Sequence, residues 1–283
     1  LFFLAMHTTR LHLGPSVTHP YQRHPLLTAA NVAALDELSG GRAFLGLGRG
    51  DVNDHQALHL PMMRPLRTLR EAAQIARLAL AGSAEAFDGE VFQIDANFDL
   101  AFTPVRADVP IYLGVTAPMG FRLAGEIADG VHVAGLFRPQ AISLVQENIS
   151  IGAARVGRSV EEIDLAASCW ASIGDDVQGA MLLVKRLLIL RLPLLPAMAE
   201  AAGVEKRDVE AIAAHVARQE FDAATRHISD QAASSFSFCG TPEQAIRNLE
   251  NVVGAGVRHV IFKPPLGPDR AQAITLIGER ILP

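Results

Sequence analysis

The chain has 283 residues, of which 49% are hydrophobic and 6% aromatic, and its formal net charge is −5. This length and composition favour a single domain with a large aliphatic core over two average domains. Acidic and basic residues are scattered along the chain and form no blocks, which excludes the electrostatic signature of a nucleic-acid-binding protein.

Neither a membrane span nor a disulfide framework is predicted. The most apolar run, residues 181–195, is interrupted by charged residues and a proline and is shorter than the ~20 residues of a membrane helix. It is typical of a buried helix or a contact surface. Cys169 and Cys239 lie far apart in the sequence and outside any CxxC motif, which predicts two buried thiols in a reducing cytoplasm.

The N-terminal part of the chain predicts a βαβ unit. Residues 1–10 look like the last turns of a helix whose beginning is absent, and residues 11–17 form the first predicted strand. A helix then begins at His24 and Pro25 and stops at Ser39-Gly40-Gly41, because proline suits the first helical turn and glycine follows helix ends. Residues 43–48 form the next strand. Two strands joined by a helix lie parallel, so the loops after both strands open at the same end of the sheet.

Strands and helices continue to alternate along the rest of the chain. A capping box at Thr241–Gln244 marks one helix start with particular clarity. Strands are predicted at residues 110–115, 130–134, 164–172 and 259–262, a small hairpin at 90–102, and helices at 65–82, 117–128, 141–149, 241–254 or 256, and 268–282. The pattern over residues 174–235 is helical and too long for one crossover, so an insertion of several helices is predicted there.

The alternation gives six strands, each followed by a helix. An open doubly wound sheet accommodates six strands, whereas a closed barrel requires eight. We expect an α/β fold, a (β/α)₈ TIM barrel whose first two strands are not in this sequence. The whole of residues 1–283 then forms one barrel domain that carries the insertion at 174–235.

Candidate site residues follow the predicted strands, because the chemistry of parallel α/β folds collects at the carboxyl ends of the strands. Asp51 can point into the barrel mouth, and the imidazole of His19 suits proton donation to a developing anion. Alternate glycines at Gly46, Gly48 and Gly50 would let backbone lie against a flat ligand. The predicted cofactor contacts are Ser16, Val17, Thr18 and His19 after the first strand, and Gly48, Arg49, Gly50 and Asp51 after the second.

A third loop, residues 114–120, joins a strand to a helix start. Free N–H groups at such a junction form an anion site, and small residues let a phosphate approach closely. Glycine or proline also occurs in most ordinary turns of this kind, so the structural interpretation stays open. His55 and His59 share i,i+4 spacing but lack the glutamate of an HExxH zinc site, and no metal is predicted.

The motifs taken together resemble the bacterial-luciferase-like superfamily. They are GPSVTHPYQRHP, LDELSGGR, GLGRGD, PIYLGVTAPM followed by RLAGEIADGV, and GTPEQAIRNLENVVGAGVRHVIF, and they cover nearly the whole chain in order. The branch that the chain resembles most is that of deazaflavin enzymes similar to methylenetetrahydromethanopterin reductase, which use coenzyme F420.

The resemblance implies a (β/α)₈ barrel with a flavin or deazaflavin ring across its C-terminal mouth. It further implies that a non-prolyl cis peptide at Ser16–Val17 supports the ring, that Asp51 matches the family's acidic residue, and that Val115, Thr116 and Ala117 match its phosphate loop. Three departures concern the first two strands, which are not in this sequence, His19, where relatives often carry Asn or Thr, and Arg49, where deazaflavin relatives often carry a small residue. The last two departures leave the choice between F420 and FMN open.

The function expected from these observations is an F420-dependent oxidoreductase that moves hydride between the deazaflavin and a small organic substrate, with Asp51 and His19 holding or moving the accompanying proton. One alternative is an FMN-dependent monooxygenase that activates oxygen in the same mouth. Another is a catalytically silent flavin-binding protein. A homodimer formed through barrel helices, a cytoplasmic location, and no nucleic-acid or membrane partner are expected.

Overall fold

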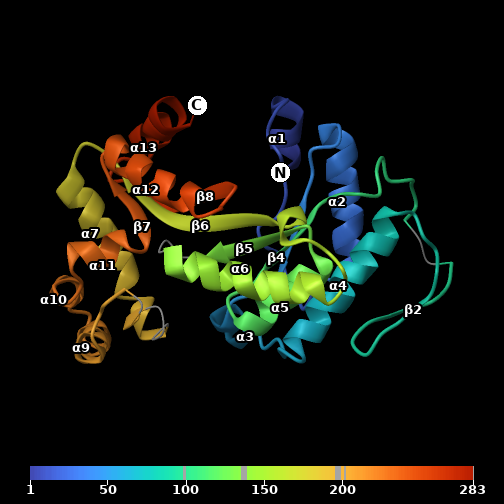
Figure 1. Ribbon diagram of the computed structural model, residues 1–283, viewed down its shortest axis with the longest axis horizontal. Coiled ribbons are helices and arrows are strands. Elements are labelled where there is room, and N and C mark those ends of the chain that lie inside the picture. The colour runs from blue at the N-terminus through green and yellow to red at the C-terminus, as the bar shows by residue number, and fades with distance from the viewer. Residues whose placement is uncertain (98–99, 135–138, 195–198, 201, 283) are drawn as a thin grey trace. The chain divides into compact units, whose positions relative to one another are not determined.

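A computed structural model describes residues 1–97, 100–134, 139–194, 199–200 and 202–282. The chain forms two compact units (Figure 1). The first contains Leu1–Val133 and Leu144–Leu165, and the second contains Ala134–Ser143 and Ala166–Pro283.

The first unit is built on parallel strands covered by helices. Strands β1 (Leu45–Gly48), β4 (Ile111–Gly114) and β5 (Gly130–Ala134) pair in that order, with Gly48 opposite Gly114 and Gly114 opposite His132. The strand ends are therefore level at the edge where Gly48 and Gly114 lie. The helices are α1 (Phe2–His7), α2 (Pro25–Ser39), α3 (Val52–Ala57), α4 (Pro65–Leu80), α5 (Pro118–Ile127), the part of α6 (Pro139–Ala154) from Leu144 onward, and the short η1 (Val160–Glu162).

The predicted strand at residues 11–17 is wrong as a continuous strand. This segment runs parallel to β1 but pairs with it only through isolated bridges, Leu13 to Ala43 and Thr18 to Leu47. Pro15 has no N–H to donate, which interrupts the ladder. The pairing resumes where the Thr18 N–H donates to the Gly46 carbonyl at 2.9 Å. The segment therefore still follows the direction and edge that the sequence predicted.

The hairpin predicted at residues 90–102 exists but lies earlier in the chain. Its strands are β2 (Phe87–Asp88) and β3 (Gln93–Ile94), while residues 98–99 lie outside the described residues. The buried carboxylate of Glu71 fixes the turn by accepting the backbone N–H groups of Glu90, Val91 and Phe92 at 2.9–3.0 Å. This long-range anchor decides the position of the turn, and local sequence carries no trace of it.

The buried carboxylate of Asp36 joins the end of α2 both to Arg106, which precedes β4, and to the chain just before β1. Asp36 is only 1% exposed, and its carboxylate accepts two 2.8 Å hydrogen bonds from the Arg106 guanidinium and one from the Ala43 N–H. Helix α2 ends as predicted, with Gly40 in the left-handed conformation at φ 68°. These contacts fix the end of α2 relative to the strands of the sheet that follow it in the chain.

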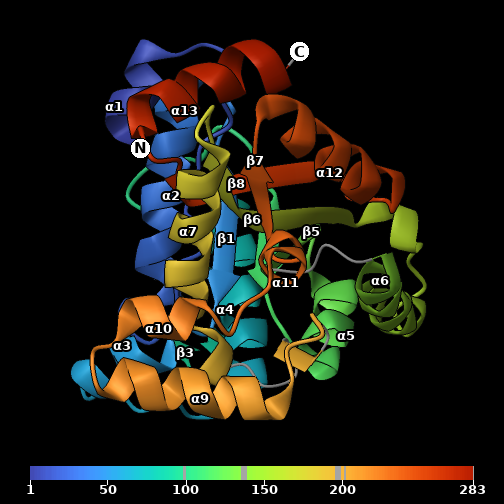
Figure 2. The same cartoon turned by 90° about the vertical axis from the view of Figure 1, so that its left-hand side faces the viewer.

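The second unit contains the predicted helical region. Helices α7 (Val177–Leu188), η2 (Leu192–Leu194), α9 (Lys206–Ala217), α10 (Phe221–Thr225) and α11 (Asp230–Ser234) occupy the described part of residues 174–235 (Figure 2). They lead to β7 (Ser237–Gly240), α12 (Pro242–Gly254), β8 (His259–Leu266), α13 (Arg270–Leu276) and a π-helical turn, η3 (Ile277–Ile281). Both β7 and β8 pair in parallel with β6 (Asp164–Ile173).

Strand β7 was missed by the sequence interpretation. All four of its residues are buried, so it lacks the alternation of apolar and polar residues by which a half-buried strand is recognised. The capping box that follows it is confirmed. Thr241 Oγ1 accepts the Gln244 N–H, while Gln244 Oε1 accepts the Thr241 N–H at 2.9 Å.

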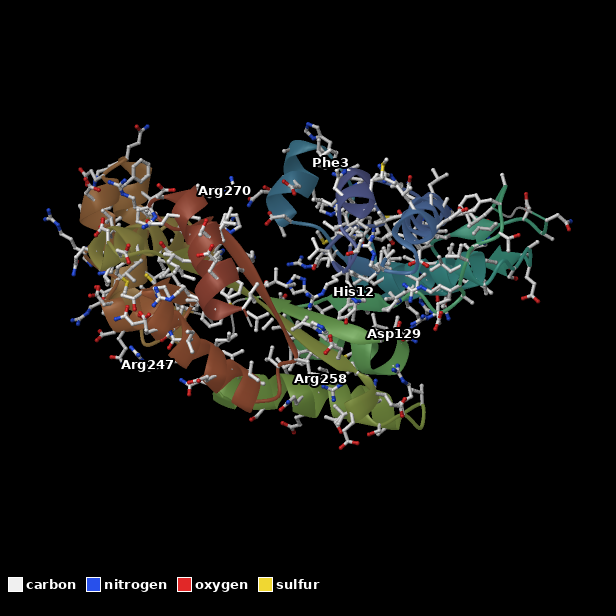
Figure 3. All side chains as sticks on the ribbon, turned by 90° about the horizontal axis from the view of Figure 1, so that it is seen from above. Phe3, His12, Asp129, Arg247, Arg258 and Arg270 are labelled. Carbon is white, nitrogen blue, oxygen red and sulfur yellow. The ribbon has the colours of Figure 1, made fainter. Side chains whose placement is uncertain are left out.

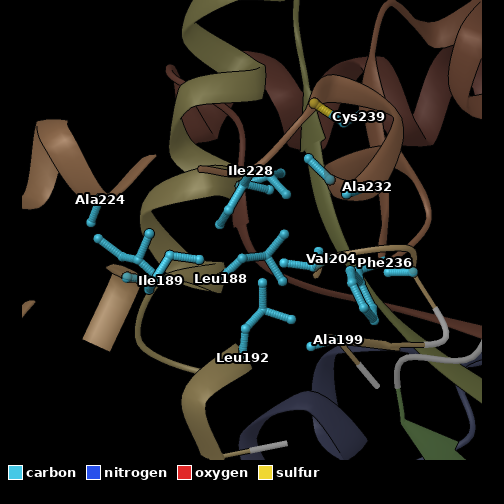
Figure 4. Close-up of a cluster of buried hydrophobic side chains, with 14 of the residues drawn as sticks. Leu188, Ile189, Leu192, Ala199, Val204, Ala224, Ile228, Ala232, Phe236 and Cys239 are labelled. Carbon is cyan, nitrogen blue, oxygen red and sulfur yellow. The ribbon is translucent and has the colours of Figure 1, made fainter. Parts of the chain in front are cut away.

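The apolar run at residues 181–195 contributes a buried helix face, as predicted, although Leu195 lies outside the described residues. Leu188, Ile189 and Leu192 pack with Ile228 and other apolar side chains in one buried cluster (Figure 4). Both cysteines are free and buried, again as predicted, and burial raises the pKa of Cys239 to about 11.

Over the part of the chain that the structure describes, no helix combines the length and apolarity needed to cross a bilayer. Nitrogen-tipped and oxygen-tipped side chains are interspersed over both units (Figure 3), in agreement with the scattered charges of the sequence.

Candidate functional site

The predicted site residues at the end of the 11–18 segment and at the end of β1 lie together at one edge of the first unit's sheet. The Thr18 N–H donates to the Gly46 carbonyl at 2.9 Å, and the Gly48 N–H donates to the Thr18 carbonyl at 2.8 Å. The register then places Gly114 of β4 opposite Gly48. Three chain segments thus end side by side, as expected of a site at the carboxyl ends of parallel strands.

Val17 lies across two of these strand ends. The Ser16–Val17 peptide bond is cis, as the resemblance implied. A Cβ atom added at Gly48 would stand 2.5 Å from Val17 Cγ2, and one added at Gly114 would stand 2.8 Å from Val17 Cγ1. Only glycine fits beneath the side chain at these positions. Because Val17 is still 40% exposed, it offers a small apolar platform to a ligand.

His132 extends this platform and was missed by the sequence interpretation. It lies on β5, and its Nδ1 is 3.0 Å from the hydroxyl oxygen of Ser16. One indication was available, since His132 is the sole polar side chain in the otherwise apolar strand GVHVA. This contact holds Ser16, the residue directly before Val17, against β5.

His19 packs against a second histidine beside the β1 loop. Its ring centroid is 5.2 Å from that of His55, and both rings lie next to Gly50. Burial lowers the pKa of His19, His55 lowers it further, and Asp54 opposes the shift. Nδ1 of His19 is buried and has no hydrogen-bond partner within the described residues. The neutral imidazole is therefore the form that this environment favours.

His55 holds the β1 loop together through two backbone carbonyl groups. Its Nε2 lies 2.8 Å from the Arg49 carbonyl and its Nδ1 lies 3.2 Å from the Leu60 carbonyl. Within the described ranges no group of three or more His, Cys, Asp or Glu side chains is arranged to hold a metal ion. The two carbonyl contacts of His55 fix the segment that carries Arg49, Gly50 and Asp51.

Asp51 is exposed and begins a helix that the sequence interpretation missed. Its Oδ1 accepts the Asn53 N–H at 2.8 Å, which caps α3. Gly50 before it has a φ of 81°, a conformation that favours glycine, and its neighbour Arg49 is exposed with Nη1 3.6 Å from Met62 Sδ. The cap gives the Asp51 carboxylate a defined position at the start of α3.

The loop Val115–Ala117 leads from β4 into α5. Val115 is buried, while Thr116 and Ala117 are exposed. No side chain of the described residues caps α5 at Ala117, and Pro118 occupies the first turn. The exposed loop and the uncapped N–H groups of α5 therefore form an opening suited to a phosphate.

Comparison with known proteins identifies the family of the chain. The family model described as "Luciferase-like monooxygenase" matches residues 1–259. The chain belongs to the luciferase-like family. Its α/β fold, with six strands in the main parallel sheet of the described residues, is the luciferase-like fold that the sequence predicted.

The relatives of this luciferase-like protein include reductases and dehydrogenases. The chain is 32% identical to a 5,10-methylenetetrahydromethanopterin reductase from Archaeoglobus fulgidus over 100% of this chain and 86% of the relative. It is 28% identical to an F420-dependent glucose-6-phosphate dehydrogenase from Nakamurella multipartita over 98% of this chain and 78% of the relative. The solved structure of the coenzyme F420 dependent tetrahydromethanopterin reductase from Methanopyrus kandleri matches with a TM-score of 0.90 and 31% identity, over 99% of this chain and 84% of that one.

Proposed function

We propose that this luciferase-like protein is an F420-dependent oxidoreductase that transfers hydride between the deazaflavin and a small organic substrate. The observation that carries the proposal is the similarity over nearly the whole chain, at a TM-score of 0.90 and 31% identity, to a reductase whose cofactor is F420. The matches to F420-dependent dehydrogenases support the same cofactor.

The residues at the strand ends fit such a group. The exposed face of Val17, held over Gly48 and Gly114, is an apolar support on which a flat ring can rest. The opening at Thr116 and Ala117 suits the phosphate of the same ligand. We assign cofactor contact to the loop set Ser16–His19, Gly48–Asp51 and Val115–Ala117.

When bound, the deazaflavin supplies the hydride chemistry, and the protein supplies orientation and proton control. Burial lowers the pKa of His19 and so favours its neutral form, which can take up a proton at a ring nitrogen. The Asp51 carboxylate, fixed as the cap of α3, can hold a proton donor close to the ring. These are the two residues that we propose to manage the proton that accompanies the hydride.

Anaerobic titration of purified protein with F420 and candidate donors tests the proposal. We expect F420 fluorescence to change on binding and the deazaflavin absorbance to fall with a suitable donor. His19→Gln and Asp51→Asn should lower kcat while F420 still binds, and His12→Gln, an exposed histidine elsewhere in the first unit, should leave kcat unchanged. Absence of both F420 binding and any absorbance change with every donor contradicts the proposal.

The same preparation separates the two alternatives predicted from the sequence. Oxygen consumption with FMN and a flavin reductase would identify a monooxygenase. Tight cofactor binding without turnover, unaffected by Asp51→Ala, would identify a catalytically silent binding protein. We also propose that the protein works in the cytoplasm as a homodimer, and light scattering of the purified protein tests the dimer.

A further inference from the structure

Helices α4 and α5 of the first unit lie side by side (Figures 1 and 2). Residues of both helices line a charged cavity of about 220 Å³, and its polar lining consists of Arg67, Arg70, Glu126 and Arg155. Arg67 and Arg70 come from the first turns of α4, Glu126 comes from the last turn of α5, and Arg155 directly follows α6. None of these residues belongs to the site described above.

Cations outnumber the anion in this lining. Arg155 Nη1 lies 2.8 Å from Glu126 Oε1, and Arg70 donates to Glu126 Oε2, so two guanidinium groups share one carboxylate. Burial raises the pKa of Glu126, but hydrogen bonds from both arginines outweigh burial and lower it, so the carboxylate stays ionised. Each guanidinium carries five N–H donors, more than one shared carboxylate can occupy.

Arg67 adds a third guanidinium to the lining of the cavity. Its Nη2 lies 2.7 Å from Glu90 Oε1, and the two side chains are 47% and 50% exposed. An ion pair this exposed contributes little and is screened by salt. Arg67 can therefore exchange Glu90 for a carboxylate of a ligand.

Along α5, the lining of the cavity starts shortly after the loop proposed to bind the phosphate. Its lining includes Met119, two residues after Ala117, and Glu126, seven residues further along α5. At 1.5 Å per residue, the cavity follows α5 for about 10 Å. A ligand whose phosphate is bound at Thr116 and Ala117 would direct whatever extends beyond that phosphate toward the three arginines.

We propose that this cavity binds the oligoglutamyl tail of coenzyme F420. The inference rests on the proposed function. Beyond its phosphate, F420 carries glutamate residues joined through their side-chain carboxyl groups, and each residue has a free carboxylate. Guanidinium groups bind carboxylates through paired N–H donors, which suits the three arginines Arg67, Arg70 and Arg155 in the cavity lining.

Fluorescence titration measures the dissociation constants of two forms of the cofactor, F420 with several glutamates and F420 that ends at the phospholactyl group. For the natural protein we expect the glutamylated form to bind roughly three- to tenfold more tightly, as two or three partly exposed charge pairs would produce. The preference should shrink as salt is raised.

Arg155→Gln and Arg67→Gln should each reduce this preference without changing the affinity for the form that lacks glutamates. Arg77→Gln is the matched control, because Arg77 lies on α4, is paired with Asp129 and does not line the cavity. Thermal unfolding of every variant verifies folding. If Arg155→Gln unfolds, Arg67→Gln carries the test, because its partner Glu90 is half exposed.

Three results would overturn the inference. The first is equal affinity of the natural protein for both cofactor forms, and the second is an equal loss of affinity for both forms in the arginine variants. The third is an unchanged cofactor preference together with a raised KM for the substrate, which would assign the cavity to a substrate carboxylate. Failure of both forms to bind would instead refute the proposed function itself.

Discussion

The contact of Val17 with the strand-end glycines makes a double-variant experiment decisive. In Gly48→Ala, the new methyl group would stand 2.5 Å from Val17 Cγ2, about 1 Å closer than an ordinary contact between carbon atoms. Val17 is β-branched and has few rotamers to escape into. Either its side chain or its backbone must move.

The structure predicts which second change relieves the clash. In Gly48→Ala combined with Val17→Ala, the closest remaining neighbours of the new methyl group are the Gly114 carbonyl at 3.4 Å and the Cβ of residue 17 at 3.5 Å, which are tolerable contacts. Gly48→Ala should therefore cost about 1–3 kcal/mol of unfolding free energy in the natural background and much less in the Val17→Ala background.

Urea unfolding of the four proteins that make up this cycle measures the coupling, and F420 titration measures its consequence for the site. We expect Gly48→Ala to abolish tight F420 binding, because the platform moves by about the size of the clash. The reasoning is refuted if Gly48→Ala destabilises the protein equally in both backgrounds, since the cost would then not arise from Val17.

Other features of the fold give further predictions. Asp36→Asn should lower the unfolding free energy by about 3 kcal/mol, because it breaks a buried ion pair, whereas Asp222→Asn in an exposed pair should cost under about 0.5 kcal/mol in the same urea assay. Thr241→Ala removes a helix cap, so thermal unfolding should show a loss of about 1 kcal/mol. Burial raises the pKa of Glu71, but hydrogen bonds from three backbone N–H groups outweigh burial and lower the pKa. The ionised carboxylate therefore stabilises the fold fully above the ordinary glutamate range, and this stabilisation is lost below about pH 4. Urea unfolding of Glu71→Gln across acid pH should not show that loss. The pKa of His19 is lowered, so its protonated form is disfavoured in the folded protein, and stability should fall as pH drops below about 6.5 in the natural protein but less in His19→Gln.

Elements marked by local chemistry could be predicted from the sequence. Helix α2 begins at Pro25 and stops at Gly40, and α12 begins at its capping box, because each boundary is encoded by residues within the same turn. The motif-based resemblance also placed the cis peptide at Ser16–Val17, which periodicity alone does not indicate.

Features set by distant partners could not be predicted in this way. The hairpin is positioned by Glu71, some twenty residues upstream of the turn, and β7 is buried on all four positions without a period. His132 reaches Ser16 across 116 positions of sequence, and Arg155 reaches Glu126 across 29. Such contacts depend on how the helices and strands pack, and no spacing in the chain reports that packing.

The strand-end glycines also require a different explanation from the one that the sequence suggested. Alternate glycines in GLGRGD predicted that bare backbone would lie directly against a flat ligand. In the structure the space above Gly48 is occupied by Val17, and Gly114 on the neighbouring strand leaves room for the same side chain. The glycines thus act through Val17. An alanine at either position should displace the Val17 side chain, and the new methyl group itself need not contact a ligand. A small residue at a strand end can therefore serve a cofactor site without touching the cofactor.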